Sequence, residues 1–322
     1  MKRILIVKIT SLGDVVLAQP VVTDVLHAFP DVQIDWATDG AYADIPGWNP
    51  GVSKVFSAPL RQFKRMRNRQ GAMAILRSIK ALREHRYDAI IDIHGAYKSA
   101  IVSFLARAKR RYGYENRSLG ERGAAFAYSH RMHRPKGVSA VQGMRASAAH
   151  ALGYELTGPA HYNLKVPLHA SSASLPADTV LFLHGASKAE KNWPFDHWVA
   201  LGKILQAKGL HIALPWSSDE EFERATRIVE ALPGATVLPK LSLTDCAKTI
   251  ASAALIVGVD TGLTHLAHAF SRPAVMIFMA TSRNHYGIAA EGLGVSVGDS
   301  GDCPSVDTVL NAVHQVLPHK DH

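Results

Sequence analysis

Short apolar runs alternate with amphipathic stretches along this chain. Residues 3–9 and 180–183 are almost continuously apolar, which predicts strands that are buried on both faces of a sheet. Other stretches carry apolar residues at helical spacing, as at Ile75, Ile79 and Leu82. Strands that alternate with helices predict parallel sheets, because each crossover helix returns the chain to the same edge.

The same pattern predicts one architecture in both halves of the chain. In the first half it predicts strands at residues 3–9, 32–37 and 87–93, and helices at 15–29, around 75–82 and at 98–109. In the second half it predicts strands at 180–183, 211–214, 236–238, 255–259 and 274–278, and helices at 194–207, 219–232, 243–253 and 261–270. Residues 153–177 are rich in Gly, Pro, Ser and His without a clear period, which is typical of a linker.

These elements predict an α/β fold with two Rossmann-like domains. We place the first domain at residues 1–160, a linker at 161–178 and the second domain at 179–322. In open parallel sheets, ligands bind beyond the carboxyl ends of the strands. We therefore expect the active site in a cleft between the two sheets.

The composition is that of a globular protein, with 47% hydrophobic and 20% charged residues. Lys8 and Asp14 interrupt the apolar N-terminal stretch, and no apolar run approaches the roughly 20 residues that span a bilayer. Cys246 and Cys303 lack the spacing of a metal or redox motif. We expect a cytoplasmic protein without a signal peptide, a membrane-spanning helix or a metal site.

The charge is unevenly distributed. Residues 1–150 contain 24 Lys and Arg against 11 Asp and Glu, a net +13, whereas residues 151–322 contain 12 against 16, a net −4. Basic clusters at 61–86 and 107–145 predict a polyanionic partner, the alternative for each being a solvated basic helix face. A nucleic-acid partner is disfavoured, because the clusters lack regularly spaced aromatic residues on which bases could stack.

Residues 260–265 stand where a predicted strand ends and a helix begins. The first-turn amides and the positive end of the helix dipole stabilise a phosphate there. Gly262 lets backbone approach the phosphate, and Thr261 adds a hydroxyl donor. The alternative is a helix without a ligand, in which Asp260 or Thr261 is the N-cap and His265 points into the core.

Two more strand-to-helix junctions of the second half carry charged residues. The loop at 184–194 contains Lys191, whose cation would neutralise the charge that grows on a departing phosphate, the alternative being an ordinary surface lysine. Glu220 and Glu221 follow the next strand, where a carboxylate can accept hydrogen bonds from sugar hydroxyls. The alternative is that they only stabilise the first turn of the helix.

The first strand-to-helix junction, residues 8–14, holds a single glycine. It therefore lacks the Gly-x-Gly-x-x-Gly spacing of a dinucleotide site, which disfavours an oxidoreductase. Asp14 follows the strand, where a carboxylate can take a proton from an attacking hydroxyl. The alternative is that Asp14 caps the helix predicted at 15–29.

Four segments in combination resemble the lipopolysaccharide core heptosyltransferases. They are residues 8–14, Lys191-x-Trp193-Pro194, Leu214-Pro215-Trp216 and Asp260-Thr261-Gly262-x-x-His265. Further segments at 35–36, 45–48, 87–92 and 237–240 are more similar to the heptosyltransferase I branch than to heptosyltransferase II. The resemblance covers nearly the whole chain. It implies the GT-B fold and an inverting transfer of heptose from ADP-L-glycero-β-D-manno-heptose to a Kdo residue of Kdo-lipid A, without a metal or another cofactor.

The resemblance also implies a role for each matched residue. Asp14 would be the general base, and Lys191 would neutralise the departing ADP. The donor site would comprise Ser187, Lys191, Glu221, Leu241, Asp260, Thr261, Gly262 and His265, and the acceptor site Lys8, Ser11, Gly13, Arg61, Lys64, Arg65 and Arg67. Two positions depart from the family pattern, because Ala186 replaces a usual hydroxyl residue and residues 279–281 replace a Gly-Pro-Thr-like turn.

The resemblance accounts for the charge asymmetry, because the basic first domain would attract the phosphates and carboxylates of Kdo-lipid A. The basic residues of 61–67, interleaved with Phe63 and Met66, are candidates for contacting those phosphates or the anionic inner-membrane surface. We expect a monomer, peripheral on the cytoplasmic face of that membrane. Transfer by a heptosyltransferase II or III to an already heptosylated core, and a non-catalytic nucleotide-sugar-binding protein, stay open as alternatives.

Overall fold

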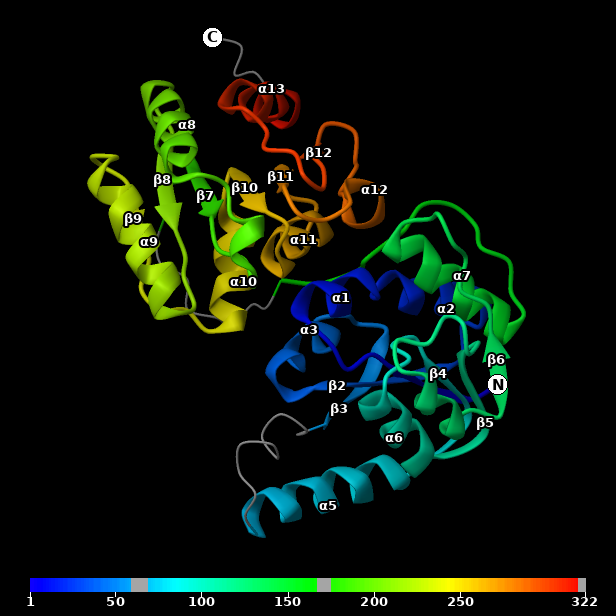
Figure 1. The fold of residues 1–322 in the computed structure, drawn as a ribbon. Coiled ribbons are helices and arrows are strands. Elements are labelled where there is room, and N and C mark those ends of the chain that lie inside the picture. The colour runs from blue at the N-terminus through cyan, green and yellow to red at the C-terminus, as the bar shows by residue number, and fades with distance from the viewer. Residues whose placement is uncertain (59–68, 167–174, 318–322) are drawn as a thin grey trace. The chain divides into compact units, whose positions relative to one another are not determined.

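The computed structural model describes residues 1–58, 69–166 and 175–317. The chain divides into two compact units, Met1–Lys165 and Val166–His322. Figure 1 shows the strands of each unit flanked by its helices. The predicted acceptor residues Arg61, Lys64, Arg65 and Arg67 lie outside the described residues.

The first unit folds around a six-stranded parallel sheet in the order β3-β2-β1-β4-β5-β6. Its strands are β1 (Arg3–Val7), β2 (Gln33–Asp39), β3 (Val52–Ala58), β4 (Arg86–Asp92), β5 (Arg107–Tyr114) and β6 (His130–Met132). Its helices are α1 (Leu12–Leu17), α2 (Pro20–Ala28), α3 (Asp44–Gly47), α5 (Arg69–Arg83), α6 (Tyr97–Leu105) and α7 (Ala140–Leu152), with the 3-10 helices η1 (Gly40–Tyr42) and η2 (Arg122–Ala127). Residues 4–7 of β1 are fully buried, as expected of a central parallel strand with both faces covered.

The second unit repeats this plan, with a six-stranded parallel sheet in the order β9-β8-β7-β10-β11-β12. Its strands are β7 (Thr179–Leu183), β8 (His211–Leu214), β9 (Thr236–Val237), β10 (Leu255–Val259), β11 (Ala274–Phe278) and β12 (Gly294–Gly298). Its helices are α8 (Phe195–Ala207), α9 (Asp219–Glu230), α10 (Leu243–Ser252), α11 (Gly262–Ala269), α12 (Arg283–Tyr286) and α13 (Val306–Val316), with the 3-10 helix η3 (Ala189–Lys191). Across the described residues, no helix is both long and apolar enough to cross a membrane.

The predicted α/β class and its parallel sheets are confirmed, with corrections to individual elements. The helix predicted at 15–29 is two helices that meet at Pro20, because proline lacks an amide donor and fits the first position of a helix. The helix predicted at 98–109 ends at Leu105, and β5 follows with an exposed, basic first half. Such a partly exposed strand lacks the continuous apolar run that identifies a buried one.

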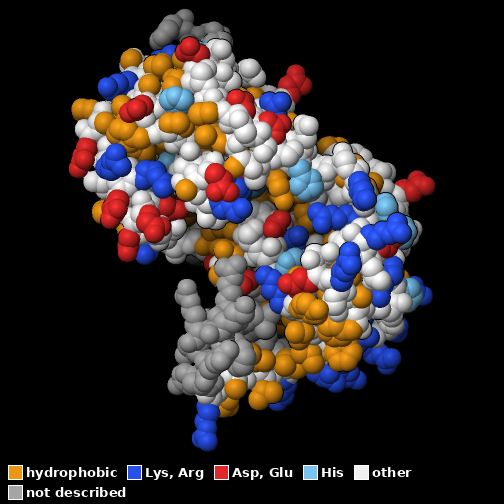
Figure 2. Space-filling model, in the orientation of Figure 1, with side chains coloured by type: hydrophobic (Ala, Val, Ile, Leu, Met, Phe, Trp, Pro, Cys, Tyr) orange, Lys and Arg blue, Asp and Glu red, His pale blue; other side chains and the backbone are white. Residues whose placement is uncertain are grey.

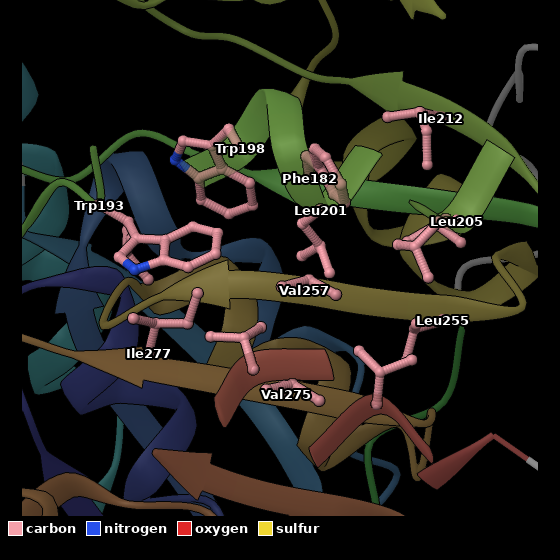
Figure 3. Close-up of a cluster of buried hydrophobic side chains, with 14 of the residues drawn as sticks. Phe182, Trp193, Trp198, Leu201, Leu205, Ile212, Leu255, Val257, Val275 and Ile277 are labelled. Atoms are coloured by element: carbon pink, nitrogen blue, oxygen red, sulfur yellow. The ribbon is translucent and has the colours of Figure 1, made fainter. Parts of the chain in front are cut away.

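A cluster of aromatic and aliphatic side chains holds α8 against the sheet of the second unit (Figure 3). The ring centroid of Trp198 lies 4.8 Å from that of Phe182 and 5.1 Å from that of Trp193. The indole Nε1 of Trp193 donates a hydrogen bond of 2.9 Å to the carbonyl oxygen of Pro304. The loop between β7 and α8 is therefore anchored in the core at its far end.

A buried ion pair joins α2 to α7 in the first unit. Arg145 donates from Nε and Nη2 to the two carboxylate oxygens of Asp24, at 2.8 Å each. The side chain of Arg145 is 1% exposed, and its Nη2 also donates to the carbonyl oxygens of Gly158 and Pro159. Removing one partner of such a pair leaves the other charge buried without compensation.

We predict that Arg145→Ala lowers the free energy of unfolding of the first unit by about 3–5 kcal/mol, because the Asp24 carboxylate loses its partner. Native-state hydrogen exchange of the α2 and α7 amides measures this within the first unit alone. Arg86→Ala is the matched control, since Arg86 is exposed, and its effect should stay below about 0.5 kcal/mol. Equal amide protection in both variants would contradict the prediction.

Candidate active site

Three of the predicted chemistry-bearing loops, at residues 8–14, 184–194 and 260–265, lie where the strand order of each sheet reverses. In the first unit this point lies between β1 and β4, which are adjacent although they are not consecutive. In the second unit it lies between β7 and β10. Loops that leave the carboxyl ends of two such strands diverge, which opens the sheet edge to a ligand.

Asp14 lies in the first turn of α1, whose N-cap is Ser11, so the alternative that Asp14 caps the helix is wrong. Its Oδ2 accepts hydrogen bonds from the hydroxyls of Ser11 at 2.9 Å and Thr10 at 3.0 Å. Within the described parts of the chain, its Oδ1 has no hydrogen-bond partner. Gly13 is the second residue of α1 and precedes Asp14. One carboxylate oxygen is thus held by protein, and the other is left for a further donor.

The charges around Asp14 keep its carboxyl ionised. Burial raises the pKa of Asp14, but the Lys8 ammonium and the two hydroxyl donors outweigh burial and hold that pKa below its usual value. Lys8 is itself buried, which lowers the pKa of its ammonium, and its Nζ donates to the carbonyl oxygen of Ile93 at 3.2 Å. Burial, with the charges of Lys8 and Lys98, lowers the pKa of His94 to about 3. At neutral pH, this side chain is therefore neutral.

Two residues of this half-site, Asp92 and His94, were not singled out from the sequence. Asp92 is fully buried and accepts hydrogen bonds from the hydroxyls of Tyr128 at 2.8 Å and Ser103 at 3.1 Å, and from the amide of His94 at 3.0 Å. Burial raises its pKa. The signal available in the sequence was their place at the end of a predicted strand.

In the second unit, Asp260 binds three side chains from different elements. Its Oδ2 accepts from Lys191 Nζ at 2.7 Å and from the Thr281 hydroxyl, and its Oδ1 lies 3.5 Å from His265 Nε2. Burial raises the pKa of Asp260, but its bonds with His265, Lys191 and Thr281 outweigh burial and hold that pKa well below its usual range. Both oxygens are engaged, so Asp260 positions Lys191. Thr281 belongs to the turn that departs from the family pattern.

The helix α11 begins with the Thr261 hydroxyl, which has no hydrogen-bond partner among the described residues. Thr261 is its N-cap, and no side chain caps the amides that follow. Gly262 is the first helical residue, and His265 is buried one turn later. This arrangement can donate amide hydrogen bonds to an anion. Over the described ranges, no group of three or more His, Cys, Asp or Glu side chains could hold a metal ion.

Glu221 lies beside the loop that follows β7. A Cβ added at Gly185 would come within 2.4 Å of Glu221 Oε1, so a larger residue there would displace the Glu221 carboxylate. The other oxygen of Glu221 accepts from the amide and the hydroxyl of Ser217, at 2.7 Å each. Ser187 is exposed in the same loop, and Leu241 is half-buried after β9. Neither has a hydrogen bond to Asp260 in the part of the chain that the structure describes.

The profile of glycosyltransferase family 9 (heptosyltransferase) matches residues 75–309. A protein of Escherichia coli K12 named lipopolysaccharide heptosyltransferase 1 is 34% identical over 284 residues, which cover 87% of this chain and 88% of the relative. The protein of that name from Pseudomonas aeruginosa PAO1 is 35% identical over 286 residues, 87% of this chain and 79% of the relative. Lipopolysaccharide heptosyltransferase 2 of E. coli K12 is 26% identical over 312 residues, 87% of this chain and 83% of the relative.

Solved structures agree with this match. E. coli heptosyltransferase WaaC with ADP aligns with a TM-score of 0.86 and 30% identity, covering 98% of this chain and 99% of that one. The same enzyme with ADP-2-deoxy-2-fluoro heptose aligns with a TM-score of 0.80 and 31% identity, covering 97% and 98%. The resemblance and the GT-B fold class predicted from the sequence are confirmed.

We predict that Lys8→Met moves the titration of the Asp14 carboxyl to higher pH, because the ammonium that lowers its pKa is lost while burial remains. The carbon-13 chemical shift of the Asp14 carboxyl, followed by NMR between about pH 4 and 7, should be flat in the wild type and begin to titrate in the variant. Lys54→Met, which removes an exposed lysine paired with Glu84, is the control. An identical titration in all three proteins would refute the electrostatic role of Lys8.

Proposed function

Because this chain belongs to glycosyltransferase family 9, the heptosyltransferases, we propose that it transfers L-glycero-D-manno-heptose from ADP-heptose to a Kdo residue of Kdo-lipid A in inner-core synthesis. Its higher identity to relatives named heptosyltransferase 1 than to one named heptosyltransferase 2 supports an acceptor that carries no heptose. The solved relatives that hold ADP and an ADP-heptose analogue support the donor.

The observation that carries the proposed chemistry is the unpartnered Oδ1 of the ionised Asp14, as far as the described residues go. In our proposal this oxygen accepts the proton of the acceptor hydroxyl as the hydroxyl oxygen bonds to the anomeric carbon of the heptose. The bond from that carbon to the ADP oxygen breaks in the same displacement, so the configuration inverts. Ser11 and Thr10 hold the other oxygen and thereby orient the carboxylate.

The second unit would bind the donor and receive the leaving group. Lys191, held by Asp260 at 2.7 Å, would neutralise the charge that develops on ADP as the glycosidic bond breaks. The first-turn amides of α11, with the Thr261 hydroxyl and Gly262, would bind the diphosphate. Glu221 would accept hydrogen bonds from the nucleoside, with Ser187, Leu241 and His265 completing the site. The reaction as proposed needs neither a metal nor another cofactor.

The acceptor that we propose is a membrane lipid, so we also propose that the enzyme works at the cytoplasmic face of the inner membrane without crossing it. Lys8, Ser11 and Gly13 would lie beside the acceptor sugar. The net charge of +13 on residues 1–150 supports attraction to an anionic lipid. We also propose that the enzyme acts as a monomer.

We predict that Asp14→Asn lowers kcat for heptose transfer by about 10²- to 10⁴-fold, because the amide cannot accept the hydroxyl proton. The Kd for ADP, measured by calorimetry, should stay within about twofold of wild type, since Asp14 acts on the acceptor. Transfer is assayed on Kdo-lipid A and, in parallel, on the heptosylated acceptor. Asp31→Asn, at an exposed aspartate, is the control. Near-wild-type turnover in the Asp14 variant would rule out its role as base.

We predict that Lys191→Met lowers kcat by about 10²-fold, because a positive charge near the departing diphosphate matters most in the transition state. Lys188→Met is a matched control from the same loop, since Lys188 is exposed and paired only with Glu190 at 3.6 Å among the described residues. Single-turnover kinetics with saturating ADP-heptose separate the chemical step from binding. If both variants retain wild-type turnover, Lys191 has no part in the chemistry.

A further inference from the structure

The first unit carries a cluster of exposed, large apolar side chains on α6 and η2. Tyr97, Ile101 and Phe104 of α6 are 50%, 44% and 57% exposed, and Phe126 of η2 is 54% exposed. We call these four residues the aromatic face. Figure 2 shows hydrophobic side chains gathered over these two elements. A patch of large exposed apolar side chains on a folded protein marks an interaction surface.

The aromatic face inverts the usual distribution of side-chain size. The residues of α6 and η2 that are buried are small, among them Ala100, Ala124 and Ala127, whereas the four large residues of the aromatic face are exposed. The ring of Tyr97 lies so close to Gly123 that a Cβ at that position would overlap it. The rings of Phe104 and Phe126 lie with their centroids 5.6 Å apart. These contacts hold the exposed rings in place. Rings buried in the core would contribute more to the free energy of folding than rings left in water.

The surroundings of the aromatic face are strongly basic. Residues 93–136 contain ten Lys and Arg against two Asp and Glu. Of the two acidic residues, Glu115 has its Oε1 3.8 Å from His133 Nδ1. The Glu121 carboxylate accepts a hydrogen bond from the backbone amide of Tyr97. The side chains of Arg107, Arg110 and Arg122 are exposed and make no hydrogen bond or ion pair with the residues that the structure describes.

The neighbouring helix α5 has the same character. It contacts α6, and it carries Met73 and Leu76, which are 58% and 64% exposed. Its sequence, Arg69–Arg83, contains four Lys and Arg and no acidic residue. A helix with exposed apolar residues and only positive charges is typical of a segment that lies in the interface of an anionic bilayer.

The helix α6 also connects this surface to the candidate active site. Its second residue is Lys98, whose charge acts on both Lys8 and His94 beside Asp14. Ile101 and Phe104 follow on the same helix. An acceptor whose reacting sugar is attached directly to a lipid anchor keeps that sugar close to the headgroups, so the surface next to the base has to approach the membrane.

We propose that the aromatic face is the membrane-docking surface, with Phe104 and Phe126 inserted among the headgroups of an anionic bilayer and Arg107, Arg110 and Arg122 bound to its phosphates. This assignment rests on the proposed lipid acceptor. The positive charge selects an anionic lipid surface over a second copy of this chain, whose own aromatic face would bring like charges together. Apolar insertion together with a basic rim provides the two contributions that stable peripheral binding requires.

The test is sedimentation with vesicles of phosphatidylethanolamine and phosphatidylglycerol, compared with vesicles of phosphatidylcholine. We expect Phe104→Ser combined with Phe126→Ser to lower the partition coefficient on the anionic vesicles by about tenfold or more. Leu293→Ser, at an exposed apolar residue of the second unit, is the control and should leave it unchanged. Arg110→Gln combined with Arg122→Gln should weaken binding to the anionic vesicles only.

A second readout separates this proposal from the proposed function. The phenylalanine double variant should transfer heptose at the wild-type rate to a deacylated, water-soluble acceptor and at least about fivefold more slowly to acceptor embedded in anionic vesicles. Wild-type vesicle binding by that variant, or an equal loss in the Leu293 control, would overturn the docking surface. A changed oligomeric state with unchanged vesicle binding would make a second copy the occupant and also overturn it. If the wild type transfers to neither acceptor, the proposed function fails, whereas the vesicle result still decides the surface.

Discussion

The parallel pairing of β1 with β4, and of β7 with β10, determines where this protein can carry out chemistry. In the first unit Val7 lies opposite Asp92, so the next residues of both strands, Lys8 and Ile93, leave the sheet together and are joined by a hydrogen bond of 3.2 Å. In the second unit β10 pairs with β7 as far as Gly258 and Leu183, and Asp260 follows two residues later. Because the strand order reverses at both points, the loops diverge and leave a space beyond the carboxyl ends of these strands. The rest of each half-site is attached to these strand ends.

Two aspartates, Asp14 after β1 and Asp260 after β10, differ in what surrounds them. Asp14 is held through one oxygen by two hydroxyls, and a buried lysine keeps it ionised while its second oxygen stays unpaired within the described residues. Asp260 is engaged through both oxygens by a lysine, a threonine and a histidine. The same side chain is therefore suited to accept a proton in one unit and to hold a cation in the other. The difference lies in the number of donors that the neighbouring elements supply.

The two units also differ in where their large apolar side chains lie. The second unit keeps its large apolar side chains, such as Trp193 and Trp198, in its core and offers amides and charges at the sheet edge. The first unit buries small residues under α6 and turns large ones outward among arginines. In our proposals, the sheet edge of the second unit binds the nucleotide sugar, and the exposed apolar and basic surface of the first unit binds an anionic lipid.

The sequence by itself determined several of the buried strands, because hydrophobic periodicity is local. The strands at 211–214, 255–259 and 274–278 have the predicted bounds, and Thr261 is one of the two N-cap residues named in the alternative without a ligand. The basic β5 was missed, because its pairing with β4, and not its own hydrophobicity, makes it a strand. Only the tertiary structure decided that the Thr281 hydroxyl donates to Asp260 and that the Glu221 carboxylate packs against Gly185. It also decided that Asp92 accepts a hydrogen bond from the amide of His94, in the loop beside Asp14. The first two contacts, and the approach of that loop to Asp14, join residues far apart in the chain, and only the order and register of the strands bring them together.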